Sequence, residues 1–193
     1  MYIRFKRISD IVVSALGIAF LMPFMVVLVL TIKLDSPGPI LFRQRRVGIN
    51  RMTFDIMKFR TMSIDTPKDT PTHMLENPEK YITRVGKVLR KTSLDELPQI
   101  FNILKGDMSV VGPRPALWNQ YDLLDERDKY GANSIRPGLT GWAQIHGRDE
   151  ISIAEKAKLD GYYFENIGLW MDVKCFFGTF VAVVKSEGFA EGG

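Results

Sequence analysis

The longest hydrophobic run of the chain lies near its start, where residues 11–32 carry no charged side chain. This length is close to the ~20 residues that an α-helix needs to cross a bilayer. Pro23 lies inside the run, where a proline bends or breaks a helix. Basic residues flank the run on both sides, and they favour the cytoplasmic face of a membrane. The pattern predicts a re-entrant membrane helix–break–helix over residues 1–34, with an ordinary kinked span as the alternative.

Shorter patterns follow over residues 35–193, which we expect to form a cytoplasmic domain held at the membrane. Two short strand patterns, 40–43 and 53–59, predict a small β-hairpin rich in basic residues. Helical patterns occupy residues 81–89, 94–104, 116–129, 152–164 and 169–184. The last of these suits a core helix, or a helix in the membrane interface with Trp170 at headgroup depth. The expected fold class is α+β and mainly helical.

Two stretches predict irregular structure. Residues 63–78 are polar and contain prolines, which indicates a mobile loop, and residues 186–193 indicate a frayed tail. We expect substrate specificity to lie in loops such as 63–78 and 147–151.

Composition narrows the classes of function. The 193 residues are 46% hydrophobic and carry a formal net charge of +4, which favours anionic partners such as anionic lipid, phosphorylated substrates or nucleic acid. Cys175 is the only cysteine, which excludes an intrachain disulfide and a cysteine-based zinc cluster. His73 and His146 are the only histidines, which argues against a Ser-His-Asp hydrolase and a histidine-rich metal site.

The acidic pair Asp95–Glu96 is the strongest candidate for chemistry. Ser93 suits a helix N-cap, and Glu96 follows at the spacing of a capping box. Asp95 would then lie in the first turn, where the helix dipole favours the ionised carboxylate. Cations at helical spacing precede the pair, namely Arg84, Lys87, Arg90 and Lys91. A plain helix cap without chemistry stays open as the alternative for Glu96.

Two loops and one helix add further candidates. Arg114 lies between two prolines, which fix the backbone and prepare the guanidinium for phosphate binding. Arg136 is followed by glycines and by Trp142, a combination that suits a nucleotide with its phosphate on the cation and its base near the ring. A rigid surface turn and a glycine turn with a core tryptophan are the respective alternatives. Asp160, on the helix expected over 152–164, would ordinarily be a solvated surface charge.

Taken in order, the motifs resemble those of the bacterial sugar transferases, and specifically the small monotopic phosphoglycosyl transferases. The resemblance extends over residues 6–185. It is carried by Ser36-Pro37-Gly38-Pro39-Ile40, Gln44-x-Arg46-x-Gly48, Lys58-Phe59-Arg60-Thr61-Met62, Ser93-x-Asp95-Glu96-Leu97-Pro98-Gln99, Lys105-Gly106-Asp107-Met108-Ser109, Gly112-Pro113-Arg114-Pro115 and Arg136-Pro137-Gly138-x-Thr140-Gly141-Trp142-Ala143-Gln144.

This resemblance implies a reaction and a set of site residues. A sugar-1-phosphate would move from a UDP-sugar to undecaprenyl phosphate, with release of UMP and a requirement for Mg²⁺. Asp95 matches the family nucleophile, which forms an aspartyl–phosphosugar intermediate and also holds the metal, and Glu96 matches its dyad partner. The residues that match substrate-binding positions of the family are Lys58, Arg90, Arg114, Arg136 and Asp160.

The resemblance also implies location and partners. It predicts a re-entrant anchor, amphipathic helices that lie flat at the interface, and a catalytic domain on the cytoplasmic face of the bacterial inner membrane. Membrane lipid is an expected partner and nucleic acid is not, while a homo-oligomer stays open. Two rival hypotheses are a non-catalytic, membrane-anchored anion-binding protein and a ternary-complex transferase in which the acidic pair only holds metal.

Overall fold

The computed structural model describes residues 2–66, 78–147 and 151–185. Most of the loop expected over 63–78, the middle of the loop 147–151 and the tail 186–193 lie outside these residues. The fold class is confirmed as α+β and mainly helical. The helices in the described residues are α1 (Tyr2–Asp35), α2 (Arg84–Lys91), α3 (Gln99–Lys105), α4 (Tyr121–Asp128), α5 (Ile153–Glu165) and α6 (Leu169–Lys185).

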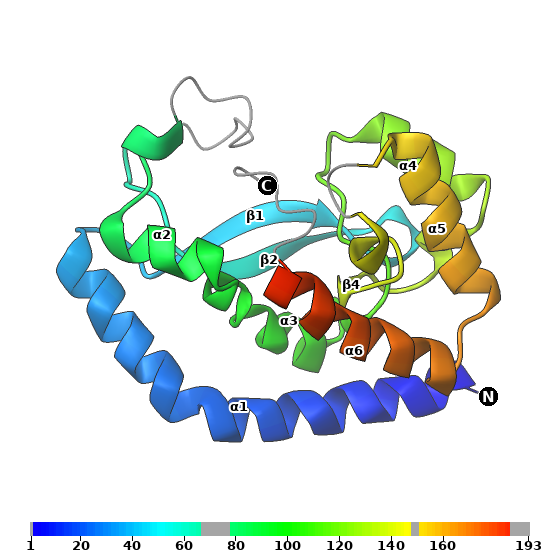
Figure 1. The fold of residues 1–193 in the computed structure, drawn as a ribbon, viewed down its shortest axis with the longest axis horizontal. Coiled ribbons are helices and arrows are strands. Elements are labelled where there is room, and N and C mark those ends of the chain that lie inside the picture. Colours follow the sequence, from blue (N-terminus) through cyan, green and yellow to red (C-terminus); the bar gives the residue numbers. More distant parts are fainter. Residues whose placement is uncertain (1, 67–77, 148–150, 186–193) are drawn as a thin grey trace.

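The hydrophobic run forms α1, one continuous helix that passes along one side of the molecule below α2, α3 and α6 (Figure 1). Figure 1 shows that α1 changes direction part-way along, so the expected break is a bend. Pro23 lies within the helix, where the loss of one backbone hydrogen bond suffices for a bend. In the described part of the chain, α1 is the one helix that is long and apolar enough to cross a membrane.

The two sides of α1 have different environments. Met25, Leu28 and Ile32 are buried and pack in one cluster with Phe59 and Leu89 of the rest of the chain. The other side exposes large apolar residues, including Val12, Leu16, Phe20, Val27, Leu30 and Leu34. Since burial of apolar side chains is favourable, the first set joins α1 to the domain and the second set is suited to an apolar surrounding.

The predicted β-hairpin is confirmed. Strand β1 (Leu41–Val47) pairs antiparallel with β2 (Thr53–Phe59), with Leu41 opposite Phe59. β1 is longer than the predicted 40–43 because its basic half is also paired along its length. Lys58 lies on β2, and its side chain is largely buried.

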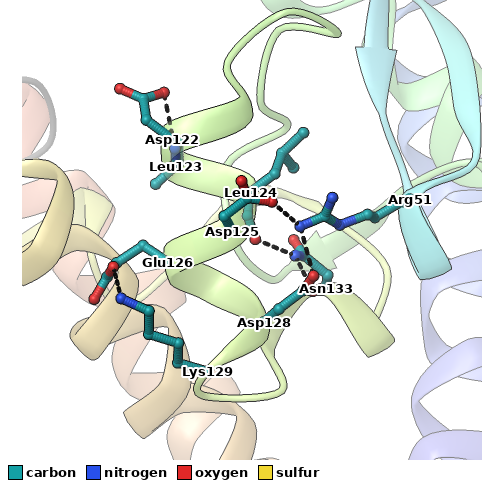
Figure 2. Close-up of polar contacts among 9 residues, drawn as sticks. All are labelled: Arg51, Asp122, Leu123, Leu124, Asp125, Glu126, Asp128, Lys129 and Asn133. Atoms are coloured by element: carbon teal, nitrogen blue, oxygen red, sulfur yellow. Dashed lines mark hydrogen bonds and ion pairs between the residues drawn. The ribbon is translucent and has the colours of Figure 1, made fainter.

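The tip of the hairpin is tied to α4 (Figure 2). Arg51, with a positive φ of 59°, approaches Asp125 and Asp128 at 2.5 Å each. Asn133 donates from Nδ2 to the carbonyl oxygen of Leu124 at 2.8 Å. Because the ion pairs are solvent-exposed, each contributes only about 0–1 kcal/mol. They orient the hairpin relative to α4 more than they stabilise the fold.

A second, parallel sheet brings two of the motifs together. β3 (Ser109–Val111) pairs with β4 (Gly138–Thr140), and Gly112 donates its backbone N–H to the carbonyl oxygen of Thr140 at 2.8 Å. A Cβ atom on Gly138 would lie 2.1 Å from the nitrogen of Gly112. Gly112 and Gly138 therefore permit close packing of two backbones, whereas the sequence suggested that the glycines after Arg136, Gly138 among them, let a ligand approach.

Helix boundaries differ from expectation in three places. The helix expected over 94–104 divides into a 3₁₀ turn, Leu94–Glu96, and α3, with Pro98 between them. The helix expected over 116–129 is shorter and begins at Tyr121. The helix expected over 81–89 begins at Arg84, because Thr83 caps it by accepting from the backbone N–H of Gly86. α5 and α6 lie close to their predicted ranges.

Candidate active site

The acidic pair lies on a tight turn between α2 and α3. Ser93 has a φ of 55° and makes no side-chain capping bond, so the predicted N-cap and capping box are wrong. The left-handed residue reverses the chain after α2 and directs the next residues inward. Asp95 is consequently 9% exposed, and Glu96 is largely buried.

Glu96 joins cations from two other parts of the chain. Its Oε1 accepts from Nζ of Lys58, on β2, at 2.9 Å and lies 3.4 Å from a terminal guanidinium nitrogen of Arg114. Arg114 follows β3, in the proline-flanked loop that the sequence identified as rigid. The structure therefore brings together three candidate residues that are up to 56 positions apart in sequence (114 − 58).

Burial dominates the electrostatics of this group. Desolvation lowers the pKa of Lys58, although the Glu96 carboxylate opposes this shift. Desolvation also raises the pKa of Asp95, and Glu96 raises it further, while Lys58 and Arg90 act in the opposite direction. The expectation that a helix N-terminus favours ionised Asp95 is therefore wrong. No regular helix begins there, and removal from water outweighs the neighbouring cations.

Arg90 approaches the pair from α2. Its Nε donates to Oγ1 of Thr61 at 3.1 Å, and burial lowers its pKa while Asp95 opposes that shift. Arg84, Lys87 and Lys91 are exposed, so the four cations do not form one face that leads to the site. Arg90 alone of these four turns inward.

Arg136 and Asp160 have partners elsewhere. Arg136 donates from Nε to the carbonyl oxygen of Gly106 at 2.8 Å and lines a small pocket next to the first turns of α1. Asp160 is 1% exposed and pairs with Arg127, whose Nε lies 2.8 Å from Oδ2. The prediction of a solvated surface charge is wrong, because α4 and α5 pack over this carboxylate. The substrate roles assigned to both residues stay predictions.

Trp142 lies in an aromatic group. Its ring centroid is 4.1 Å from that of His146 and 5.6 Å from that of Tyr162. The suggested position of a nucleotide base near Trp142 stays a prediction.

A buried network that the sequence did not reveal ties α1 to α6. Asp172 accepts from the hydroxyl of Tyr2 and from Nζ of Lys6, both at 2.7 Å, and from the hydroxyl of Tyr163 at 2.6 Å. The sequence marks Lys6 only as one of the basic residues that precede the hydrophobic run. The one available signal is Asp172 itself, the only acidic residue of a mainly apolar helix, since a buried charge needs a partner.

An apolar pocket of about 320 Å³ lies next to the acidic pair. It is bounded by the 3₁₀ turn, α1, α3, β4 and α6. Glu96 and Ser93 form part of its wall, together with Val13, Leu21, Leu97, Ile100, Ile103, Leu139, Phe176 and Phe180.

The side chains fit a metal ion that is shared with a substrate. The described residues contain no group of three or more His, Cys, Asp or Glu side chains able to hold a metal ion alone. Mg²⁺ is commonly bound by one or two carboxylates together with substrate phosphates. Asp95 can supply such a carboxylate, whereas Glu96 is engaged by Lys58 and Arg114.

Fold and site together define a protein with a long apolar N-terminal helix and a buried acidic pair held among cations. A family model described as bacterial sugar transferase matches residues 1–186. The chain belongs to the bacterial sugar transferase family.

Individual relatives agree with this assignment. Over 97% of the chain, it is 39% identical to a UDP-N-acetylgalactosamine-undecaprenyl-phosphate N-acetylgalactosaminephosphotransferase of Aeromonas hydrophila. It is 37% identical to the exopolysaccharide production protein ExoY of Sinorhizobium fredii over 95% of the chain, and 40% identical to a UDP-glucose:undecaprenyl-phosphate glucose-1-phosphate transferase of Escherichia coli over 90%. The chain spans 45%, 87% and 39% of these relatives' own lengths, respectively.

Proposed function

We propose that the protein is a phosphoglycosyl transferase that moves a sugar-1-phosphate from a UDP-sugar to undecaprenyl phosphate and releases UMP, at the membrane step that begins assembly of a glycan. The names of two relatives support these classes of donor and acceptor, but they differ in the sugar. The observation that carries the proposal is the buried Asp95–Glu96 pair with cations from three other segments, Lys58, Arg90 and Arg114. Cations fixed in advance stabilise the charge that develops when a diphosphate is cleaved.

In the first step, a carboxylate oxygen of Asp95 attacks the β-phosphorus of the donor. A bond forms between this oxygen and phosphorus, and the bond from phosphorus to the bridging oxygen breaks. UMP leaves with the bridging oxygen and its electron pair, and the phosphosugar stays on Asp95 as an acyl phosphate. Covalent catalysis of this kind divides one difficult transfer into two easier steps.

In the second step, a phosphate oxygen of undecaprenyl phosphate attacks the same phosphorus. The acyl phosphate bond breaks, the Asp95 carboxylate is restored and a lipid diphosphate sugar is released. The soluble donor and the lipid acceptor can therefore use one site in turn.

The neighbouring residues have distinct roles in this scheme. Lys58 and Arg114 hold Glu96, and with it the turn that carries Asp95. Arg90 and Lys58 oppose the effect of burial on the pKa of Asp95, so they favour the ionised nucleophile. Mg²⁺, held by Asp95 and the donor phosphates, would neutralise phosphate charge and make the phosphorus more electrophilic.

The location follows from the same reasoning. We infer that α1 enters and leaves the inner membrane on its cytoplasmic side and that α6 lies in the interface. The entry and exit of α1 on one side are supported by its bend, by the basic residues at both of its ends and by the apolar residues that it exposes. Leu169, Trp170, Phe177, Phe180 and Val181 of α6 are all more than half exposed, which supports the interfacial position of α6. Cysteines introduced at positions 2 and 40 should react with an impermeant thiol reagent from the same side of the membrane, whereas reaction from opposite sides would establish a plain span.

The function is tested by UMP release. Detergent-purified protein with Mg²⁺ and undecaprenyl phosphate should release UMP from one or more UDP-sugars in a panel, and Asp95→Asn should abolish release. Asp122→Asn is the matched control, since Asp122 is an exposed carboxylate on α4. Release of UMP by Asp95→Asn would show that the nucleophile is assigned wrongly. No release from any donor would favour the rival hypothesis of a non-catalytic anion-binding protein.

A further inference from the structure

The apolar pocket beside the acidic pair reaches both the site and the surface of the protein. Glu96 forms one part of its wall. Phe180 of α6 and Val13 of α1 form other parts, and these residues are 58% and 52% exposed. Residues of α1, α3 and α6 all line the pocket, and Figure 1 shows α1 below the other two helices. A ligand can therefore extend from the acidic pair to the apolar outer faces of α1 and α6.

The chemistry of the wall favours a hydrocarbon. Glu96 is the only ionisable side chain among the described residues that line the pocket. Three of the four hydroxyls in the described wall have protein partners: Ser14 donates to the carbonyl oxygen of Asp10 at 2.6 Å, Thr179 donates to that of Cys175 at 2.7 Å, and Thr140 pairs with Thr179. An apolar occupant leaves these hydrogen bonds intact, whereas a polyhydroxylated ligand needs more partners than the few remaining polar groups of this wall supply.

We propose that this pocket binds the isoprene units closest to the phosphate of the lipid acceptor, so that the prenyl phosphate meets Asp95 while its chain leaves between α1 and α6. The inference rests on the proposed function and deepens it, because it assigns the acceptor's chain to residues of this protein. It also identifies specificity for the prenyl chain as a property of Ala182, Val13 and their neighbours in the wall.

The volume of the pocket limits how many isoprene units of the acceptor it can hold. An apolar cavity of about 150 Å³ accepts one benzene molecule, which has six carbons. By the same proportion, about 320 Å³ accepts about 13 carbons, or between two and three five-carbon isoprene units. The rest of a long prenyl chain would lie in the bilayer.

One atom in the wall favours a different occupant. Oε1 of Gln144 is buried and has no hydrogen-bond partner among the described residues. A hydroxyl of the donor sugar could satisfy it, so the test must separate the acceptor chain from the sugar.

The first test narrows the pocket by substitution and measures the reaction of the donor and that of the acceptor separately. Ala182→Phe adds a ring to the wall, and Val181→Phe is the matched control, because Val181 is the preceding residue of α6 and is exposed. The wild type and both variants are assayed for UMP–donor exchange without acceptor, and for kcat/KM with a long prenyl phosphate. Val13→Phe, with Val12→Phe as its control, repeats the comparison on α1.

We expect Ala182→Phe to lower kcat/KM for the acceptor by about tenfold or more, as expected when two or more apolar carbons lose their burial. Exchange of UMP, which needs no acceptor, should be unchanged in both α6 variants, and Val181→Phe should resemble the wild type. Equal acceptor kinetics in Ala182→Phe and Val181→Phe would overturn the inference. A raised KM for the donor with unchanged acceptor kinetics would assign the pocket to the sugar and would overturn it too.

A second measurement uses the wild-type protein and does not depend on the folding of a variant. A prenyl phosphate with a photoreactive diazirine in its second isoprene unit should label peptides that contain residues of the pocket wall, such as Phe176 and Ile100. Labelling confined to the outer face of α1 would overturn the inference. If UMP exchange occurs but labelling misses the pocket, only this inference fails, whereas absence of exchange in the wild type contradicts the proposed function itself.

Discussion

Replacement of Lys58 by methionine tests the electrostatic account of the site. The side chains of Lys58 and Glu96 are only 14% and 13% exposed and lie 2.9 Å apart. Removal of one partner from a fully buried ion pair costs about 3–5 kcal/mol. Because Glu96 keeps Arg114 at 3.4 Å and both groups retain some exposure, we expect a loss of about 1–3 kcal/mol in the free energy of unfolding.

The same change acts on the nucleophile. Asp95 must be deprotonated to attack, and below its pKa in the folded protein it is protonated and inactive. Burial already raises this pKa, and Lys58 lowers it, so loss of Lys58 raises it further. As pH falls, release of UMP by Lys58→Met should therefore decline at a higher pH than release by the wild type.

Two assays on the same preparations check this prediction. Thermal unfolding should show a midpoint lowered by about 2–4 °C for each kcal/mol lost, and the acid limb of the pH profile for UMP release should move to higher pH. Lys87→Met, which removes an exposed lysine of α2, should alter neither. An acid limb that stays in place or moves to lower pH in Lys58→Met would refute the reasoning.

Three further predictions follow from buried groups and close packing. Arg127→Met leaves Asp160 buried without its partner and should cost about 3 kcal/mol of unfolding free energy, and Asp160→Asn in the same protein should restore part of it, as a double-mutant cycle would measure. Burial raises the pKa of Cys175 to about 12, so the thiol is protonated at pH 8. Cys175 should therefore react with a maleimide only after denaturation, and rapid labelling of the folded protein would contradict its burial. Gly138→Ala places a Cβ 2.1 Å from a backbone nitrogen and should cost about 1–3 kcal/mol or more, whereas Gly168→Ala, whose nearest neighbour would lie at 3.7 Å, should unfold at the wild-type denaturant concentration.

Much of the fold follows from local patterns in the sequence. The uncharged run predicts α1, and the alternation of side chains predicts β2 with the observed bounds. α5 begins after Ser152, whose side chain accepts from the backbone N–H of Glu155 as an N-cap residue does. Each of these depends on residues that are close together in the chain. The errors occur where contacts from distant residues decide the outcome.

The acidic pair illustrates this limit. Ser93 and Glu96 have the spacing of a capping box, but packing against β2 and α2 stabilises a left-handed residue and a 3₁₀ turn there. The spacing could not show that Asp95 becomes buried, so the sign of its pKa shift was predicted wrongly. In the same way, nothing near Asp160 in sequence indicates that Arg127 of another helix covers it.

The candidate site could be predicted in part. Lys58, Glu96 and Arg114 belong to motifs that the sequence distinguishes, and the structure brings them within ion-pair distance. The apolar pocket could not be predicted, because its wall combines residues of α1, α3, β4 and α6 whose apolar character looks like that of an ordinary core.

The central claim is that Asp95 becomes covalently phosphorylated during turnover, and intact-protein and peptide mass spectrometry test it most directly. Protein incubated with the accepted UDP-sugar and Mg²⁺, without lipid acceptor, should gain the mass of one phosphosugar on the peptide that contains Asp95. The adduct should disappear when undecaprenyl phosphate is added, and it should be absent from Asp95→Asn. Continued turnover with no adduct on that peptide, or an adduct that persists in Asp95→Asn, would contradict the account.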